Sequence, residues 1–173
     1  SDILKLAKAL DLDGPALIDI ARDRWEPDKP VDDPDFDLVC LNVFMGEYPV
    51  NCYLLRCKAT GETAVVDTGA NPKKIISKAH EMDVRPSMVL LTHAHPDHAG
   101  GLGELSSAFD CPTYIDHKEP QPKGSSKFKI VEDGDEVTLG KLRIQCIETP
   151  GHTIGGVSYL INQTLFSGDV IFA

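Results

Sequence analysis

The sequence predicts an α/β fold in which two β-sheets pack against each other between helices. Strand-like segments fall into an early group and a late group, with helix-like segments between them. The 173 residues are 42% hydrophobic, which is enough for one core of ordinary size without a second large domain. Several strand-like segments end in glycine, histidine or aspartate, and strand ends are where open α/β folds gather functional groups.

Apolar side chains at helical spacing predict two short helices near the N-terminus, at residues 2–10 and 15–25. These side chains are Ile3, Leu6, Leu10, Leu17, Ile20, Ala21 and Trp25. The Asp- and Pro-rich stretch after them predicts a linker. We therefore expect a helical extension and linker over residues 1–37 and the main domain over residues 38–173. Such an arm pads a core or a homodimer interface, and its net negative charge argues against a DNA-reading helix-turn-helix.

The main domain is expected to alternate strands with two helices. A helix at residues 72–82 is opened by Asn71-Pro72, and a second helix at residues 98–109 carries an apolar face. Both helices show apolar residues at helical spacing, namely Ile75, Ile76, Ala79 and Met82 in the first and Leu102, Leu105 and Phe109 in the second. The expected strands cover residues 38–44, 51–56, 63–67, 87–91, 112–115, 128–131, 136–139, 142–148, 157–161 and 164–167.

Four residues of metal-ligand type lie within six positions, directly after the apolar run Met88–Leu91: His93, His95, Asp97 and His98. Side chains of an extended segment alternate between faces, so the first three of them can point the same way. Neutral imidazoles and carboxylates suit zinc and other borderline divalent metals, and two such sets side by side could hold two ions. The alternative is a chance cluster on a solvated loop, which the position after an apolar strand disfavours.

Two later strand ends each add a residue of the same kind. His152 lies on a Pro-Gly turn after the alternating segment 142–147, and Asp169 follows the short apolar strand Leu165-Phe166 and a glycine. Three strand ends thus each deliver a candidate ligand. The other two histidines, His80 and His117, are interpreted as surface or packing residues.

These motifs resemble those of the metallo-β-lactamase-fold hydrolases, in the same order along the chain, over about residues 38 to 173. Within that superfamily the chain looks most like the glyoxalase II (hydroxyacylglutathione hydrolase) branch. The His-x-His-x-Asp-His core separates it from many true β-lactamases, which lack the last histidine, and His95 separates it from the flavodiiron oxygen reductases. The matching segments are Val65-Val66-Asp67-Thr68-Gly69, Thr92-His93-Ala94-His95-Pro96-Asp97-His98, Thr149-Pro150-Gly151-His152-Thr153 and Ser167-Gly168-Asp169.

The resemblance implies an αββα sandwich and a division of the ligands between two zinc ions, with iron or manganese as the alternatives. His93, His95 and His152 would hold one ion. Asp97 and His98 would hold the second, and Asp169 would bridge the two. A hydroxide bound to the metals would attack the substrate, which makes Asp97 and Asp169 the catalytic carboxylates.

Asp67 is a candidate for the shell around the ligands. Its carboxylate could accept the free N–H of a ligating histidine, which would fix the tautomer of that ring. A turn-capping role for Asp67 is the alternative.

The chain ends four residues after Asp169, whereas the family pattern continues through further strands and helices that deliver a last histidine. We therefore expect that the C-terminal part of the fold is missing and the Asp97 and His98 position is one ligand short, or that this ligand comes from elsewhere. That ion should be held more weakly than the ion at the three histidines.

We predict a metal-dependent hydrolase that cleaves a small thioester or ester. The alternatives are a mononuclear-iron persulfide dioxygenase using His93, His152 and Asp169, a lactone hydrolase, and a non-catalytic metal-binding module.

Twenty-seven acidic and seventeen basic residues give a net charge of −10, which disfavours a nucleic-acid partner. No apolar stretch is long enough to span a membrane. Five cysteines without C-x-x-C spacing are typical of reduced core residues in a cytoplasmic protein.

Overall fold

The structure is a computed structural model, and it describes residues 2–22, 24, 32–125 and 127–171. The chain divides into two compact units, residues 1–31 and residues 32–172. The division falls within the stretch predicted as a linker. No helix of the described residues is both long and apolar enough to cross a bilayer.

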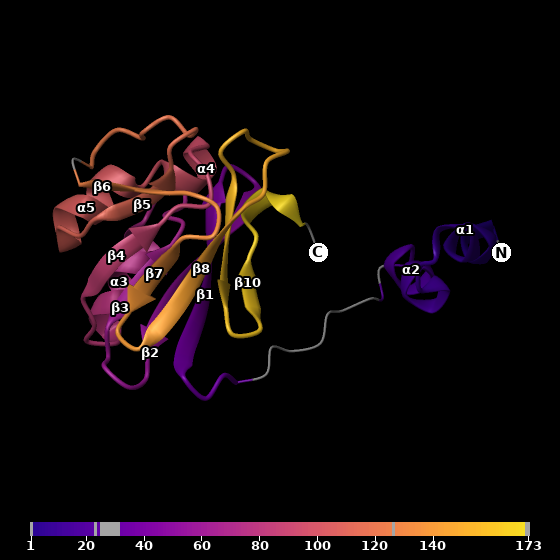
Figure 1. The fold of residues 1–173 in the computed structure, drawn as a ribbon, viewed down its shortest axis with the longest axis horizontal. Helices are drawn as coiled ribbons and strands as arrows, with labels where there is room; N and C mark the ends of the chain where they lie inside the picture. The colour runs from indigo at the N-terminus through magenta and orange to yellow at the C-terminus, as the bar shows by residue number, and fades with distance from the viewer. Residues whose placement is uncertain (1, 23, 25–31, 126, 172–173) are drawn as a thin grey trace. The chain divides into compact units, whose positions relative to one another are not determined.

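The first unit contains two helices, α1 (Asp2–Leu10) and α2 (Gly14–Ile20) (Figure 1). Asp13 caps α2, because its side chain accepts a hydrogen bond of 2.9 Å from the Ala16 N–H. The helix predicted at residues 15–25 ends at Ile20, where the Arg22 and Arg24 N–H groups both bond to the Asp19 carbonyl. Trp25 lies outside the described residues.

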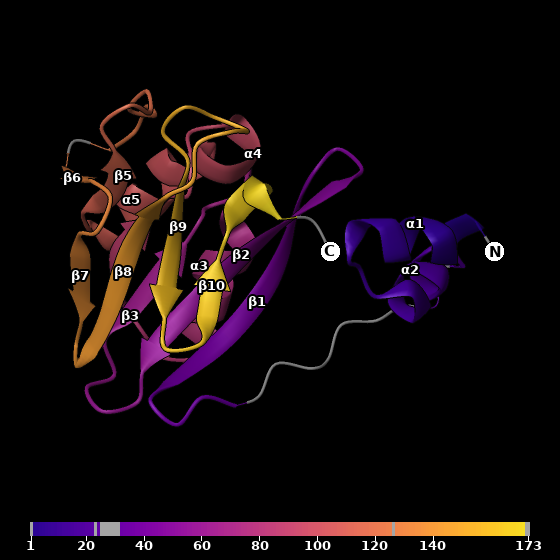
Figure 2. The ribbon, with the colours of Figure 1, turned by 45° about the vertical axis from the view of Figure 1, so that its right-hand side comes forward.

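The second unit opens with a six-stranded sheet in the order β1-β2-β3-β4-β5-β6 (Figure 2). Its first three strands are antiparallel and its last three continue in parallel. The strands are β1 (Phe36–Met45), β2 (Tyr48–Cys57), β3 (Thr63–Val66), β4 (Pro86–Leu90), β5 (Thr113–Asp116) and β6 (Phe128–Val131). β1 and β2 are longer than predicted, because they pair along their whole length up to the tight turn at Gly46. β1 also begins before residue 38.

The second sheet is antiparallel throughout, in the order β10-β9-β8-β7. Buried and exposed residues alternate along β7 and along most of β8, so these strands turn one face to the interior. The strands are β7 (Glu136–Leu139), β8 (Leu142–Glu148), β9 (Val157–Ile161) and β10 (Thr164–Phe166).

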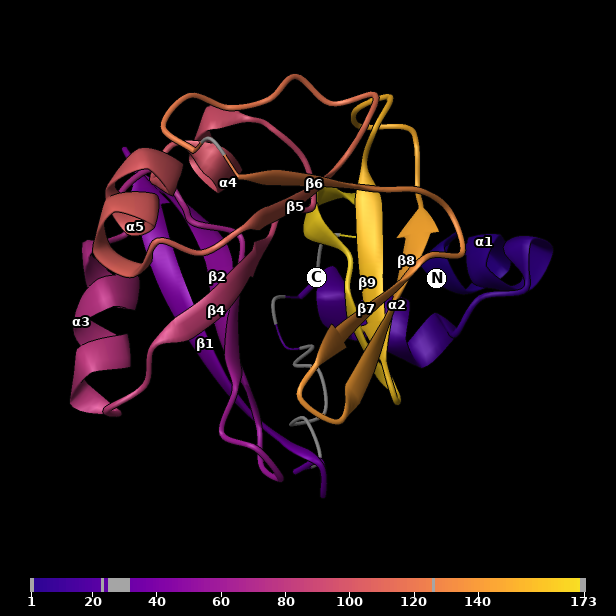
Figure 3. The same cartoon turned by 60° about the vertical axis from the view of Figure 1, so that its left-hand side comes forward.

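Two apolar cores hold the layers of the second unit together. One lies between the two sheets and includes Leu90, Ile144 and Tyr159. The other lies between the first sheet and its helices, α3 (Lys73–Glu81) and α5 (Leu102–Phe109) (Figure 3). The predicted fold class is confirmed, and the described residues supply one helical layer and both sheets of the αββα arrangement.

The helix predicted at residues 98–109 is wrong in one respect, because it is two helices. α4 (Pro96–Ala99) and α5 are separated at Gly100 and Gly101. The Gly101 N–H donates to the Gly69 carbonyl at 2.7 Å, so this amide does not continue the helical ladder. The break ties α4 to the loop after β3.

Candidate metal centre

All candidate ligands lie at one end of the two sheets. His93 and His95 follow β4, and α4 carries Asp97 and His98. The loop between β8 and β9 carries His152, and Asp169 lies in the 3-10 helix η1 (Gly168–Val170) after β10. Figures 2 and 3 show α4 and the β8–β9 loop at the same end of the molecule's second unit.

Hydrogen bonds between the two sheets fix the loop that carries the first two histidines. The Tyr159 hydroxyl donates to the Leu91 carbonyl at 3.0 Å, and the Val157 N–H donates to the Thr92 carbonyl at 2.9 Å. Gly168 packs against the same loop: its φ is +51°, and a Cβ there would lie 2.6 Å from Thr92 Oγ1. Asp169 is therefore held close to the histidines.

His93, His95 and His152 form the first group, whose nitrogen atoms lie within 4.8 Å of one another. His152 Nε2 and His95 Nδ1 are 2.9 Å apart. The three rings are packed edge to face, with centroids 4.7 to 5.1 Å apart. His93 is buried, whereas His95 and His152 are exposed, so the group opens to solvent on one side.

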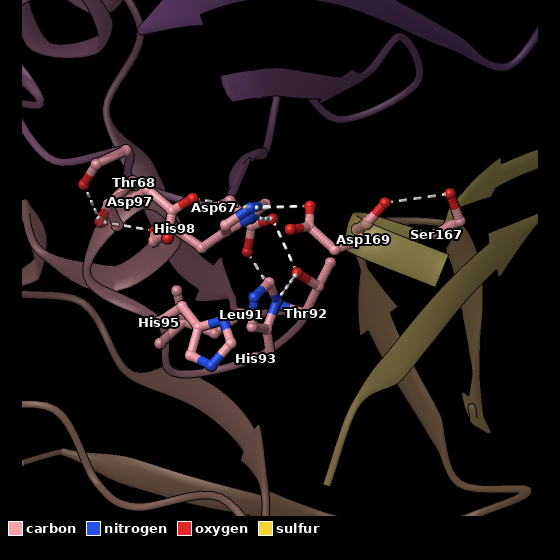
Figure 4. Close-up of polar contacts among 12 residues, drawn as sticks. Asp67, Thr68, Leu91, Thr92, His93, His95, Asp97, His98, Ser167 and Asp169 are labelled. Atoms are coloured by element: carbon pink, nitrogen blue, oxygen red, sulfur yellow. Dashed lines mark hydrogen bonds and ion pairs between the residues drawn. The ribbon is translucent and has the colours of Figure 1, made fainter. Parts of the chain in front are cut away.

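His93, His98 and Asp169 form a second, adjoining group (Figure 4). One carboxylate oxygen of Asp169 lies 3.0 Å from His98 Nε2, and the other lies 3.4 Å from His152 Nε2. Asp169 thus stands between the two groups. Asp97 is at the edge of the second group, with its Oδ2 atom 3.9 Å from His98 Nε2, and it is not among the atoms that gather within 4.8 Å.

Asp67 is buried beneath both groups and accepts three hydrogen bonds of 2.8 Å. They come from the Thr92 N–H, the Thr92 hydroxyl and His98 Nδ1. An ionised carboxylate can only accept, so His98 carries a proton on Nδ1 and turns Nε2 toward Asp169. The φ of Asp67 is positive, +54°, which also fits the turn-capping role. Both interpretations of Asp67 agree with this geometry.

The Thr92 hydroxyl fixes the tautomer of His93 in turn. Its single proton is donated to Asp67, so its contact of 3.1 Å with His93 Nδ1 must be one in which the imidazole N–H donates. The lone pair of His93 is then on Nε2. This atom is buried and has no hydrogen-bond partner among the described residues.

The electrostatic surroundings of the two buried histidines differ. Burial, together with the nearby His98, lowers the pKa of His93 to about 4, so its ring is neutral at pH 7. Burial also opposes the charged form of His98, but the hydrogen bond and charge of Asp67, with Asp169 and Asp97, raise its pKa. A proton or another cation is therefore favoured at the second group.

A metal ion fits these residues. A buried imidazole nitrogen with a free lone pair is costly unless it meets a proton donor or a cation. A cavity of about 10 Å³, lined in part by His93, His152 and Asp169, lies beside it. Neutral imidazoles with one carboxylate are the donors that zinc, iron and manganese accept.

Outside the two groups, His80 is exposed and packs edge to face on Phe109. His117 is also exposed, and it lies near Asp116 and Glu148 in a third set of ligand-type atoms. The Lys118 ammonium already contacts Glu148 there, which supplies a positive charge.

Sequence reasoning missed three residues that shape the centre, Thr92, Glu119 and Tyr159, because nothing in their local sequence marks their distant partners.

Two packed sheets with a His-x-His-x-Asp-His segment at their common end are typical of metal-dependent hydrolase folds. The chain belongs to the metallo-beta-lactamase superfamily, which residues 45–173 match. The resemblance inferred from the motifs is thereby confirmed.

Individual proteins of the superfamily are also similar to this chain. It is 42% identical over 124 residues to a hydroxyacylglutathione hydrolase of Bdellovibrio bacteriovorus, covering 69% of this chain and 48% of the relative. It is 31% identical to the "probable polyketide biosynthesis zinc-dependent hydrolase PksB" of Bacillus subtilis, covering 70% and 55%. The solved structure of TTHA1623 in a di-iron-bound form has a TM-score of 0.65 at 27% identity, covering 77% and 73%. The chain spans about half the length of the curated relatives it matches.

Proposed function

We propose that this chain binds two divalent metal ions at the common end of its sheets and hydrolyses a small thioester or ester. The three-histidine group would hold the first ion, His98 and Asp97 would hold the second, and Asp169 would serve both. The full set of assigned ligands is His93, His95, Asp97, His98, His152 and Asp169.

The buried, unpartnered Nε2 atom of His93 is the observation that carries this proposal. It belongs to both groups of ligand-type atoms, and the Asp67–Thr92 relay turns its lone pair toward them. A histidine that served packing alone would not need two neighbouring side chains to fix its tautomer.

Bound metal ions would supply a nucleophile at neutral pH and polarise the carbonyl group under attack. The protein's own residues set the conditions for this chemistry. Burial keeps His93 neutral, and Asp67 holds His98 in one tautomer. Asp97 and Asp169 keep 26% and 21% of their side-chain surface accessible, so these two carboxylates can meet a substrate and are assigned as catalytic.

The substrate class is inferred from the relatives named hydroxyacylglutathione hydrolase, which favour a thioester. Zinc is the proposed metal, and a di-iron neighbour keeps iron as the alternative. Because all five cysteines are free thiols and four are buried, we place the protein in the reducing cytoplasm.

The test is hydrolysis of a hydroxyacylglutathione thioester, with a simple ester and a lactone in parallel, by protein whose metal content is measured. Asp169→Ala should lose metal and should lower thiol release on the order of 100-fold, because it serves both groups. Glu104→Ala, at an exposed position on α5, is the control. Near wild-type activity in Asp169→Ala would show that the site is not used. Oxygen uptake with one bound iron would instead support the dioxygenase alternative.

A further inference from the structure

Glu119 is a buried carboxylate that takes no part in either group of ligand-type atoms. It follows β5 and is 7% exposed. Two hydrogen bonds fold this segment into a turn: Asp116 Oδ1 accepts from the Lys118 N–H at 2.7 Å, and the Asp116 carbonyl accepts from the Glu119 N–H at 3.2 Å. The turn sets the position of Glu119 against the histidine-bearing loops.

Each carboxylate oxygen of Glu119 accepts a backbone N–H from a different histidine-bearing loop. Oε2 accepts from Ala94 at 2.8 Å, and Ala94 lies between His93 and His95. Oε1 accepts from Gly155 at 3.1 Å, three residues after His152. Hydrogen bonds to an ionised acceptor are about twice as strong as neutral ones, so one side chain joins both loops firmly.

Gly155 is fitted to this arrangement. A Cβ at this position would lie 2.7 Å from the Glu119 nitrogen, 2.9 Å from Glu119 Cγ and 3.0 Å from Asp116 Oδ1. Real Cβ atoms do not approach other atoms so closely, so only glycine lets the His152 loop come this near to Glu119. The close approach of Gly155 and the two hydrogen bonds therefore belong to one contact, between Glu119 and the two histidine-bearing loops.

We propose that Glu119 is a positioning residue, which fixes the His152 loop relative to the His93–His95 loop and so sets the spacing of the three imidazoles. It acts without touching a metal ion or substrate. The proposal rests on the proposed function, because it assumes that the three histidines bind one ion. Residues that orient metal ligands in this indirect way commonly contribute 10- to 100-fold to metal affinity.

The test compares wild-type protein with Glu119→Gln, which keeps the shape but puts an NH₂ group opposite one backbone N–H. Zinc affinity is measured by competition with a chromophoric chelator, and the visible spectrum of the cobalt-substituted protein reports the ligand geometry. We expect about 10- to 100-fold weaker binding and an altered cobalt spectrum. Circular dichroism of the metal-free variant should match wild type. Glu104→Gln, an exposed glutamate on α5, should change none of these.

The outcomes separate this proposal from the proposed function. Wild-type protein that binds no metal at the three histidines would overturn the proposed function. Wild-type affinity and spectrum in folded Glu119→Gln would overturn the positioning role alone. If Glu119→Gln does not fold, Glu119→Asp, which retains the charge but is too short to reach both amides, takes its place. Loss of folding in both variants would also overturn the proposal, because Glu119 would then support the fold rather than the site.

Discussion

At the scale of single residues, one buried carboxylate orders both histidine groups. Asp67 orients His98 directly and His93 through the Thr92 hydroxyl. Since a neutral imidazole presents a lone pair on only one nitrogen, the choice of tautomer decides which nitrogen of the ring can bind a metal. Asp67 makes that choice for two rings.

Replacing Asp67 by Asn tests this role. Asn tolerates a positive φ, but its NH₂ group cannot accept the hydrogen bonds that Asp67 accepts, so His98 and His93 lose their fixed tautomers. We expect zinc affinity to fall about 10- to 100-fold. Asp83→Asn is a matched control, because Asp83 is exposed and also has a positive φ, +53°. Equal zinc affinity in the two variants, measured by chelator competition, would contradict the role given to Asp67.

The sequence predicts which residues could bind a metal, but not the hydrogen bonds that orient them. The spacing of His93, His95 and His98 after an apolar strand already predicts a common location. The relay through Thr92 and the contacts of Glu119 join residues up to 36 positions apart. They depend on how the sheets pack, which no local pattern encodes.

At the scale of secondary-structure elements, the site depends on strands from both sheets meeting at one end. Most elements follow from the apolar periodicity, because each turns a face into one of the two cores. The break between α4 and α5 could not be predicted in this way, since the hydrogen bond that causes it joins Gly101 to Gly69. The full length of the β1–β2 hairpin likewise reflects pairing rather than local sequence.

Tyr159 offers a test at this scale, because its hydroxyl joins β9 to the end of β4. Tyr159→Phe keeps the ring but leaves the Leu91 carbonyl without this donor. We expect the free energy of unfolding of the metal-free protein to fall by about 1 to 3 kcal/mol. Tyr48→Phe, at a position 77% exposed, should change it by less than about 0.5 kcal/mol. Urea denaturation of both variants decides the matter, and indistinguishable curves would show that the inter-sheet bond contributes nothing.

At the scale of the whole molecule, the two ligand groups are unequal. The first gathers three histidines, whereas the second shares His93 with it, and Asp97 stands 3.9 Å from His98. A site with fewer close donors holds its ion more weakly. We therefore expect the three-histidine position to fill first as zinc is added.

The most direct measurement is an anomalous-scattering map, recorded at the zinc absorption edge from crystals of the metal-loaded protein. We expect a strong peak within about 2.0 to 2.3 Å of His93 Nε2, His95 Nδ1 and His152 Nε2. A second, weaker peak is expected beside His98 Nε2 and Asp169. The absence of a peak at the three histidines, or zinc held only by Asp116, His117 and Glu148, would show that the histidines are not the metal site.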